Sequence, residues 1–130
     1  MVQKESKRSE LVRTTIALII KFAATYLAAM IAFGYINDNS TSWILMVALA
    51  GTILNWVLGD LFVLPRYGNV IAAIGDGVMA AATAFIIDLF STVFDTTLVS
   101  LITFAVIVAV AEYFFHMYLK SDNKVGPKME

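Results

Sequence analysis

Long apolar runs alternate with short polar segments along this chain. The runs cover approximately residues 14–36, 43–64, 70–90 and 98–119, and an apolar helix of about 20 residues is long enough to cross a bilayer core. Runs such as WILMVALAGTILNWVLG lack the polar stripe that a helix of a soluble bundle turns toward water. The pattern therefore predicts four membrane-spanning helices in a single membrane domain, residues 1–130, with short basic tails at both ends.

The connections between these runs are NDNSTS, PRYGN and STVFDTT, which contain turn-forming residues. Connections of this length force neighbouring helices to run antiparallel. We expect the second helix to end at Leu64, because Pro65 disfavours a helical conformation in the residue before it. Asn39 begins an Asn-Ser-Thr sequence, which we interpret as a turn rather than a glycosylation site. The predicted fold is all-α, an antiparallel up-down four-helix bundle integral to the membrane.

The composition agrees with a membrane protein and excludes several function classes. Hydrophobic residues make up 60% of the 130 residues, compared with about 45–50% in a typical soluble domain. There is no cysteine, so disulfides, thiolate metal sites and cysteine nucleophiles are excluded. The net charge of −1 offers no basic surface for nucleic acid. We expect the lipid bilayer, and no nucleic acid, among the partners.

The basic residues lie almost entirely on one side of the predicted helices. The N-terminal segment, the second connection and the C-terminal tail hold all the Lys and Arg residues except Lys21. The first and third connections have no basic residue and contain Asp38 and Asp95 instead. Because basic segments stay on the cytoplasmic side of a membrane, this distribution predicts a multi-pass cell-membrane protein with both termini in the cytoplasm.

Several polar residues interrupt the apolar runs, and such residues usually face the interior of a bundle. Depths counted at about 1.5 Å per residue place six of them in the cytoplasmic half. These six are Lys21, Asn55, Asp60, Asp76, Glu112 and His116. Glu112 and His116 are four residues apart, so they lie on one face of their helix. We expect a polar cluster, or possible ion-binding site, in which Lys21 forms an ion pair with Glu112 or Asp76.

The acids in this cluster outnumber its bases. Lys21 balances one of the three acids, and Arg66 balances a second if it reaches back from its connection. The remaining carboxyl would be protonated, paired with a charged histidine, or holding a cation. Two arrangements stay open. In one, Arg66 clasps Asp60 and Asp76 across the second connection; in the other, Asp76 turns inward and joins Lys21 and Glu112.

Small residues recur on one face of the second and third predicted helices. They are Gly51 and Gly59, with Asn55 between them, and Ala73, Gly77 and Ala81. Small residues let membrane helices approach closely, so we expect helix packing along both faces. The leading hypothesis is that these faces bind other membrane proteins or a second copy of the chain, while the ionisable residues hold the helices together.

The sequence contains no HExxH, Walker A, GxSxG or GxGxxG motif, and its one histidine makes no two-histidine metal or haem site. We therefore expect no enzyme activity, no catalytic residue, no metal and no cofactor. The leading hypothesis is a non-enzymatic membrane protein with an interaction or structural role. The alternative is a small proton- or cation-coupled transporter or channel that acts as a homo-oligomer, because intramembrane acids often mark ion pathways.

The central stretch ILNWVLGDLFVLPRYGN, followed by VIAAIGDG, resembles the YndM-like small membrane proteins of spore-forming bacteria. The resemblance is most specific between Asn55 and Asp76 and extends in outline to the four-span plan. It implies a bacterial cytoplasmic-membrane protein whose function is uncharacterised. The resemblance therefore adds support for the fold, supplies no catalytic residues and leaves the activity open.

Overall fold

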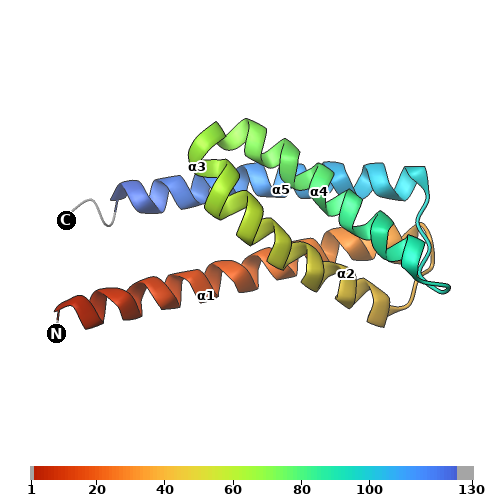
Figure 1. Ribbon diagram of the computed structural model, residues 1–130, viewed down its shortest axis with the longest axis horizontal. Helices are drawn as coiled ribbons and strands as arrows, with labels where there is room; N and C mark the ends of the chain where they lie inside the picture. The colour runs from red at the N-terminus through yellow and green to blue at the C-terminus, as the bar shows by residue number, and fades with distance from the viewer. Residues whose placement is uncertain (1, 126–130) are drawn as a thin grey trace.

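The chain is helical apart from short connections (Figure 1). The structure is a computed structural model that describes the backbone of residues 2–125 and the side chains of residues 6–59, 61–64 and 66–118. No β-strand occurs within these residues. The segments are α1 (Val2–Ala29), continued by the π-helical η1 (Met30–Tyr35); α2 (Thr41–Leu54), continued by the π-helical η2 (Asn55–Val63) and by α3 (Leu64–Tyr67); α4 (Asn69–Phe90); and α5 (Leu98–Val125). The all-helical prediction is confirmed.

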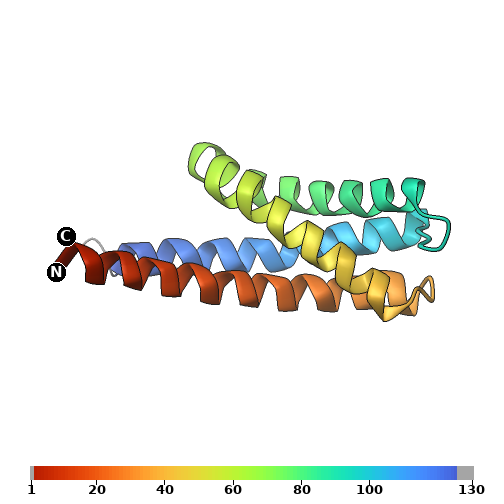
Figure 2. The same ribbon diagram turned by 60° about the horizontal axis from the view of Figure 1, so that its bottom comes forward.

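Successive long helices run in opposite directions along the long axis of the molecule (Figures 1 and 2). The first turns of α1 and the last turns of α5 lie at the same end. α4 packs along α5, whereas α2 crosses between α1 and α4 and contacts both. This arrangement brings the second half of α1, the start of η2, the first half of α4 and the second half of α5 to the same region.

Aromatic side chains fill the core at the end where η1 meets the 91–97 connection. Phe33, Phe94 and Phe104 are fully buried. The ring of Phe33 meets the rings of Phe94 and Phe104 edge to face, with centroids 5.4 and 4.9 Å apart. Trp43 stacks on Phe94 at 6.0 Å. The apolar core therefore occupies this end, and the buried polar residues described below lie nearer the other end.

Asn39 joins the 36–40 connection to the 91–97 connection, at the end of the molecule that holds the aromatic core. Its Nδ2 donates to the carbonyl oxygens of Phe33 at 3.0 Å and Asp95 at 2.8 Å, and its Oδ1 accepts from the Asp95 amide at 2.9 Å. Asp38, immediately before it, has φ 58°, a left-handed conformation that Asp and Asn tolerate better than most residues. The turn interpretation of this segment therefore matches the contacts that Asn39 makes.

The second long helix does not end at Leu64. Pro65 lies in the first turn of α3, and the helix continues to Tyr67. The helix is continuous through this position, so Pro65 leaves one backbone hydrogen bond unmade, and it does so directly after the wider π-helical segment η2. The actual turn is Gly68 alone, whose φ of 86° favours glycine. The prediction that Pro65 terminates the helix is therefore wrong.

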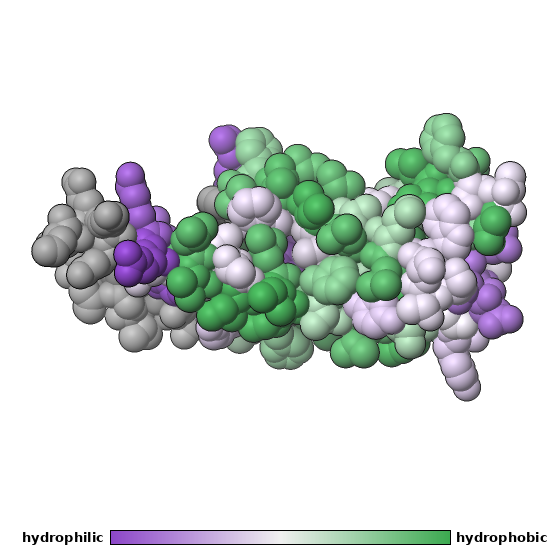
Figure 3. Space-filling model, turned by 90° about the horizontal axis from the view of Figure 1, so that it is seen from below, coloured by the Kyte–Doolittle hydropathy of each residue, from purple (hydrophilic) through white to green (hydrophobic). Residues whose placement is uncertain are grey.

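Four helices of the described chain are long and apolar enough to cross a membrane, judged by length and composition. Large apolar side chains such as Leu27, Ile74, Leu89 and Val99 are more than half exposed. Figure 3 shows hydrophobic residues over the middle of one face and hydrophilic residues gathered toward both ends. An apolar surface of this extent is typical of contact with lipid rather than with water.

Candidate ion-binding site

Five polar side chains from all the long helices meet in the interior and form what we call the polar cluster. They are Lys21 of α1, Asn55 of η2, Asp76 of α4, and Glu112 and His116 of α5. None of the five is more than 4% exposed. Burying charged groups is costly unless they are paired, so the contacts among them decide what the cluster can do.

Lys21 joins three helices. Its Nζ donates to Glu112 Oε1 at 2.7 Å and to Asn55 Oδ1 at 2.9 Å. It also lies 4.7 Å from the centroid of the Phe115 ring, within the range of a cation–π contact. The ion pair with Glu112, one of the two partners expected for this lysine, is therefore present, and the ammonium points inward.

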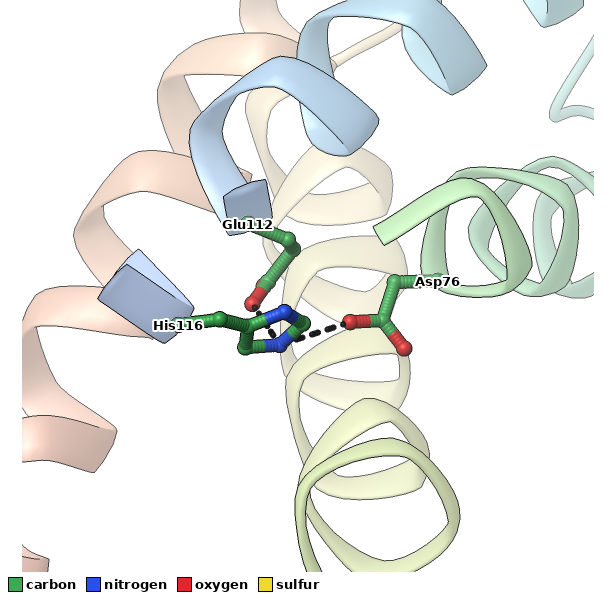
Figure 4. A group of neighbouring side chains, drawn as sticks. All are labelled: Asp76, Glu112 and His116. Atoms are coloured by element: carbon green, nitrogen blue, oxygen red, sulfur yellow. Dashed lines mark ion pairs between the residues drawn. The ribbon is translucent and has the colours of Figure 1, made fainter. Parts of the chain in front are cut away.

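His116 faces two carboxylates (Figure 4). Its Nε2 lies 3.2 Å from Asp76 Oδ2 and 3.4 Å from Glu112 Oε1. The four-residue spacing on α5 places Glu112 beside His116, and Asp76 approaches from α4 on the other side. Glu112 Oε1 is therefore shared between the ammonium of Lys21 and the imidazole of His116.

Asn69 fixes which ring nitrogen of His116 carries a hydrogen. Its Nδ2 donates to the Tyr113 carbonyl oxygen at 3.1 Å, so its Oδ1 is the atom that faces His116 Nδ1, at 3.0 Å. An amide oxygen can only accept, so Nδ1 must donate. In a neutral imidazole Nε2 would then be a lone pair directed at Asp76 and Glu112.

The three atoms on this side of the cluster, Asp76 Oδ2, Glu112 Oε1 and His116 Nε2, all lie within 4.8 Å of one another. Three converging lone pairs repel unless a positive charge lies among them. With a neutral histidine, Asp76, Glu112 and Lys21 together carry a net charge of −1. One proton on Nε2 makes the cluster neutral and gives each carboxylate a hydrogen-bond donor. The three atoms are therefore close enough together to share a cation, either a proton or a metal ion.

A family model described as "Protein of unknown function (DUF2512)" matches residues 12–129, a range that contains the whole polar cluster. The chain belongs to the DUF2512 family. Neither a curated protein nor a solved structure shows a significant match to the chain. The family description names no activity for its members. The YndM-like resemblance and a bacterial source stay predictions.

The structure of this DUF2512 protein places Asp76, the residue on which the two open arrangements differ, in the interior. Asp76 is 1% exposed and turns toward His116 and Glu112. Arg66 is exposed, and its guanidinium carbon lies 4.2 Å from the centroid of the Phe62 ring. The side chain of Asp60 lies outside the described part of the structure.

Asn69 is the residue of the site that sequence reasoning did not include. It belongs to the PRYGN segment, which the apolar pattern assigns to a connection, but in the structure it is the first residue of α4. Asp76 follows it by seven residues, a spacing that places two residues on one face of a helix. That spacing is the sequence signal that could have connected Asn69 to Asp76 and hence to His116.

The small-residue faces pack against other parts of the same DUF2512 chain. A side chain at Gly59 would overlap the Asp76 carboxylate, and one at Gly77 would overlap the Ala105 carbonyl oxygen. Gly51 faces Thr25 of α1. Ala73 is buried and Ala81 half-buried. Close helix contacts within the chain lie at these glycines, and binding of other proteins along the same faces stays a prediction.

A cavity of about 400 Å³ lies between α1 and α5 beside the polar cluster. Lys21 and Glu112 line it together with apolar and aromatic side chains that include Phe115 and Tyr118. Glu112 therefore contributes both to this cavity and to the contact with His116.

Proposed function

We propose that this protein is a multi-pass membrane protein that takes up and releases a proton at the polar cluster, as a small proton-coupled transporter or channel. The single observation behind this proposal is the position of His116. Asn69 fixes the hydrogen on Nδ1, and Nε2 faces two buried carboxylates at 3.2 and 3.4 Å. Ionisable residues inside membrane spans are expensive and commonly belong to proton relays.

The chemistry at this site is the gain and loss of one proton at Nε2. In the protonated state the imidazolium and Lys21 balance Asp76 and Glu112. Loss of the proton leaves one unbalanced negative charge in a medium where charges are poorly screened. Glu112 is the natural route for the proton, because it contacts His116 and also lines the cavity between α1 and α5.

The proposal includes an orientation and an assembly. The one-sided distribution of Lys and Arg supports cytoplasmic termini, which places the polar cluster in the cytoplasmic half of the membrane. Four spans rarely enclose a pathway alone, so we expect a homo-oligomer. We expect no enzyme activity and no cofactor, because no nucleophile has been identified beside the acid and base groups of the cluster.

A structural role is the second candidate, and the contacts of Lys21 favour it. This one ammonium joins α1 to η2 through Asn55 and to α5 through Glu112. Polar contacts of this kind hold membrane helices together without any transport activity. In this role the protein would be a non-enzymatic membrane protein that acts through its outer surface.

Proton flux into liposomes distinguishes the two candidates. The purified protein is reconstituted with a pH-sensitive dye inside, and a pH gradient is applied. We expect flux with the wild type and loss of flux with Asp76→Asn, His116→Gln and Glu112→Gln. Asp95→Asn is the matched control, because Asp95 is exposed and its hydrogen bonds to Asn39 use its backbone atoms.

Two results would refute the proton role. One is a wild type that gives no flux while the cluster variants lose thermal stability or assembly, which supports the structural candidate. The other is flux that survives unchanged in both Asp76→Asn and His116→Gln. Loss of flux in Asp95→Asn as well would point to general damage rather than to the polar cluster.

A further inference from the structure

Three atoms of the polar cluster are spaced like the ligands of a metal ion. His116 Nε2 lies 3.2 Å from Asp76 Oδ2 and 3.4 Å from Glu112 Oε1. Two ligands of a tetrahedral zinc ion, with bonds of about 2.0–2.1 Å, lie about 3.3–3.4 Å apart. Two carboxylates and one imidazole also form a donor set that divalent transition metals accept. By spacing and donor type alone, a divalent ion would fit these three groups.

Lys21 opposes such an ion. Its Nζ lies 2.7 Å from Glu112 Oε1, the same oxygen that a metal would need. A metal bound to this oxygen would lie less than about 5 Å from the ammonium, given the usual metal–oxygen bond length. Lys21, Asp76 and Glu112 together carry one negative charge, so a divalent ion would leave the buried cluster positively charged. Repulsion at this distance is strong where water is excluded.

A proton meets neither obstacle. It adds a single positive charge, which makes the cluster neutral, and it sits on Nε2 without displacing the ammonium from Glu112. Asn55 and Phe115 keep the ammonium in place, at 2.9 Å from the amide oxygen and 4.7 Å from the ring centroid. These contacts hold the ammonium beside Glu112.

We infer that Lys21 determines which cation the site accepts: its ammonium, 2.7 Å from Glu112, admits a single proton and excludes divalent metal ions from Asp76, Glu112 and His116. The inference rests on the proposed function and deepens it by naming the residue that sets the ion selectivity. It predicts that removal of this one charge converts the cluster into a metal site, because Asp76 and Glu112 then balance a divalent ion.

The test uses Co²⁺, whose visible absorption reports tetrahedral coordination, with the purified full-length protein in detergent. We expect little Co²⁺ binding by the wild type and by Lys21→Arg, which keeps the charge. We expect Lys21→Met to bind Co²⁺ at least about 100-fold more tightly, as removal of a repulsive charge at short range predicts. A further His116→Ala change in the Lys21→Met background should abolish the new absorption.

Lys21→Gln serves as a second variant, because glutamine can still hydrogen-bond Asn55 if Lys21→Met does not fold. Equal Co²⁺ binding by the wild type and the folded neutral variants would overturn the inference, as would no binding by a folded neutral variant. The inference would also be overturned if the wild type binds Co²⁺ strongly and His116→Ala abolishes that binding. This result needs no lysine variant. The titration needs no pH gradient, so its outcome is independent of whether the wild type carries protons in liposomes.

Discussion

Neutralising Glu112 while keeping its shape tests how strongly the Lys21–Glu112 pair holds α1 to α5. The side chains of this pair are 1% and 6% exposed, and the two charged atoms are 2.7 Å apart. Removing one partner of a buried ion pair costs about 3–5 kcal/mol, because the other charge stays buried without its counterion. Asn55 and Phe115 still contact Lys21, so we expect Glu112→Gln to lower the free energy of unfolding by about 3 kcal/mol, at the low end of that range.

A double-mutant cycle with Lys21→Met separates the pair from the rest of the cluster. The double variant has neither charge, so its loss of stability should be smaller than the sum of the two single losses by about 2 kcal/mol or more. Reversible unfolding in mixed micelles, followed by circular dichroism, measures each free energy. Losses that add to within about 0.5 kcal/mol would refute the reasoning, because they would mean that the two charges are not coupled.

Two further substitutions test packing and turn contacts in the same unfolding assay. Gly77→Ala should cost about 1–3 kcal/mol, because the added methyl group would collide with the Ala105 carbonyl oxygen, and overpacked sites lose stability by that amount. Gly75→Ala is its control: no heavy atom lies near the added carbon, so equal losses at both positions would contradict the packing argument. Asn39→Ala should cost about 1–3 kcal/mol, since it removes the hydrogen bonds to Phe33 and Asp95 that join the two connections. Unchanged stability in this variant would mean that these bonds only replace bonds to water.

The sequence predicted the number and type of the long helices because apolar run length is a direct physical requirement for crossing a bilayer. It predicted their ends less well. α1 begins at Val2 and α5 continues to Val125, because helical hydrogen bonding extends beyond the apolar stretch that hydropathy detects. Pro65 does not end the helix, because the chain passes it in a continuous helix whose preceding segment is π-helical, and no sequence pattern predicted that segment.

The sequence predicts which site residues share a face of one helix, because helical spacing determines this. It does not predict which neighbour that face contacts, because this depends on how the helix is rotated about its axis. The four-residue interval places Glu112 and His116 on one face, and depth brings Lys21 to their level. Whether Gly77 faces another helix of the chain or a separate protein depends on how each helix is rotated. Lipid and a neighbouring helix are both apolar, so the sequence pattern does not distinguish them. Asn69 was missed because its role depends on its contacts with Tyr113 and His116.

The contacts of the polar cluster make its structural and proton-binding roles depend on each other. Glu112 Oε1 accepts from Lys21 and also faces His116 Nε2, so both positive groups are drawn to one oxygen. Under the proposed function, any movement of α1 that withdraws Lys21 from Glu112 raises the negative charge around His116 and favours uptake of a proton. A proton on His116 equally lowers the attraction that Glu112 can offer Lys21. The pair that holds α1 to α5 is thus also the element through which helix movement and proton binding would be coupled.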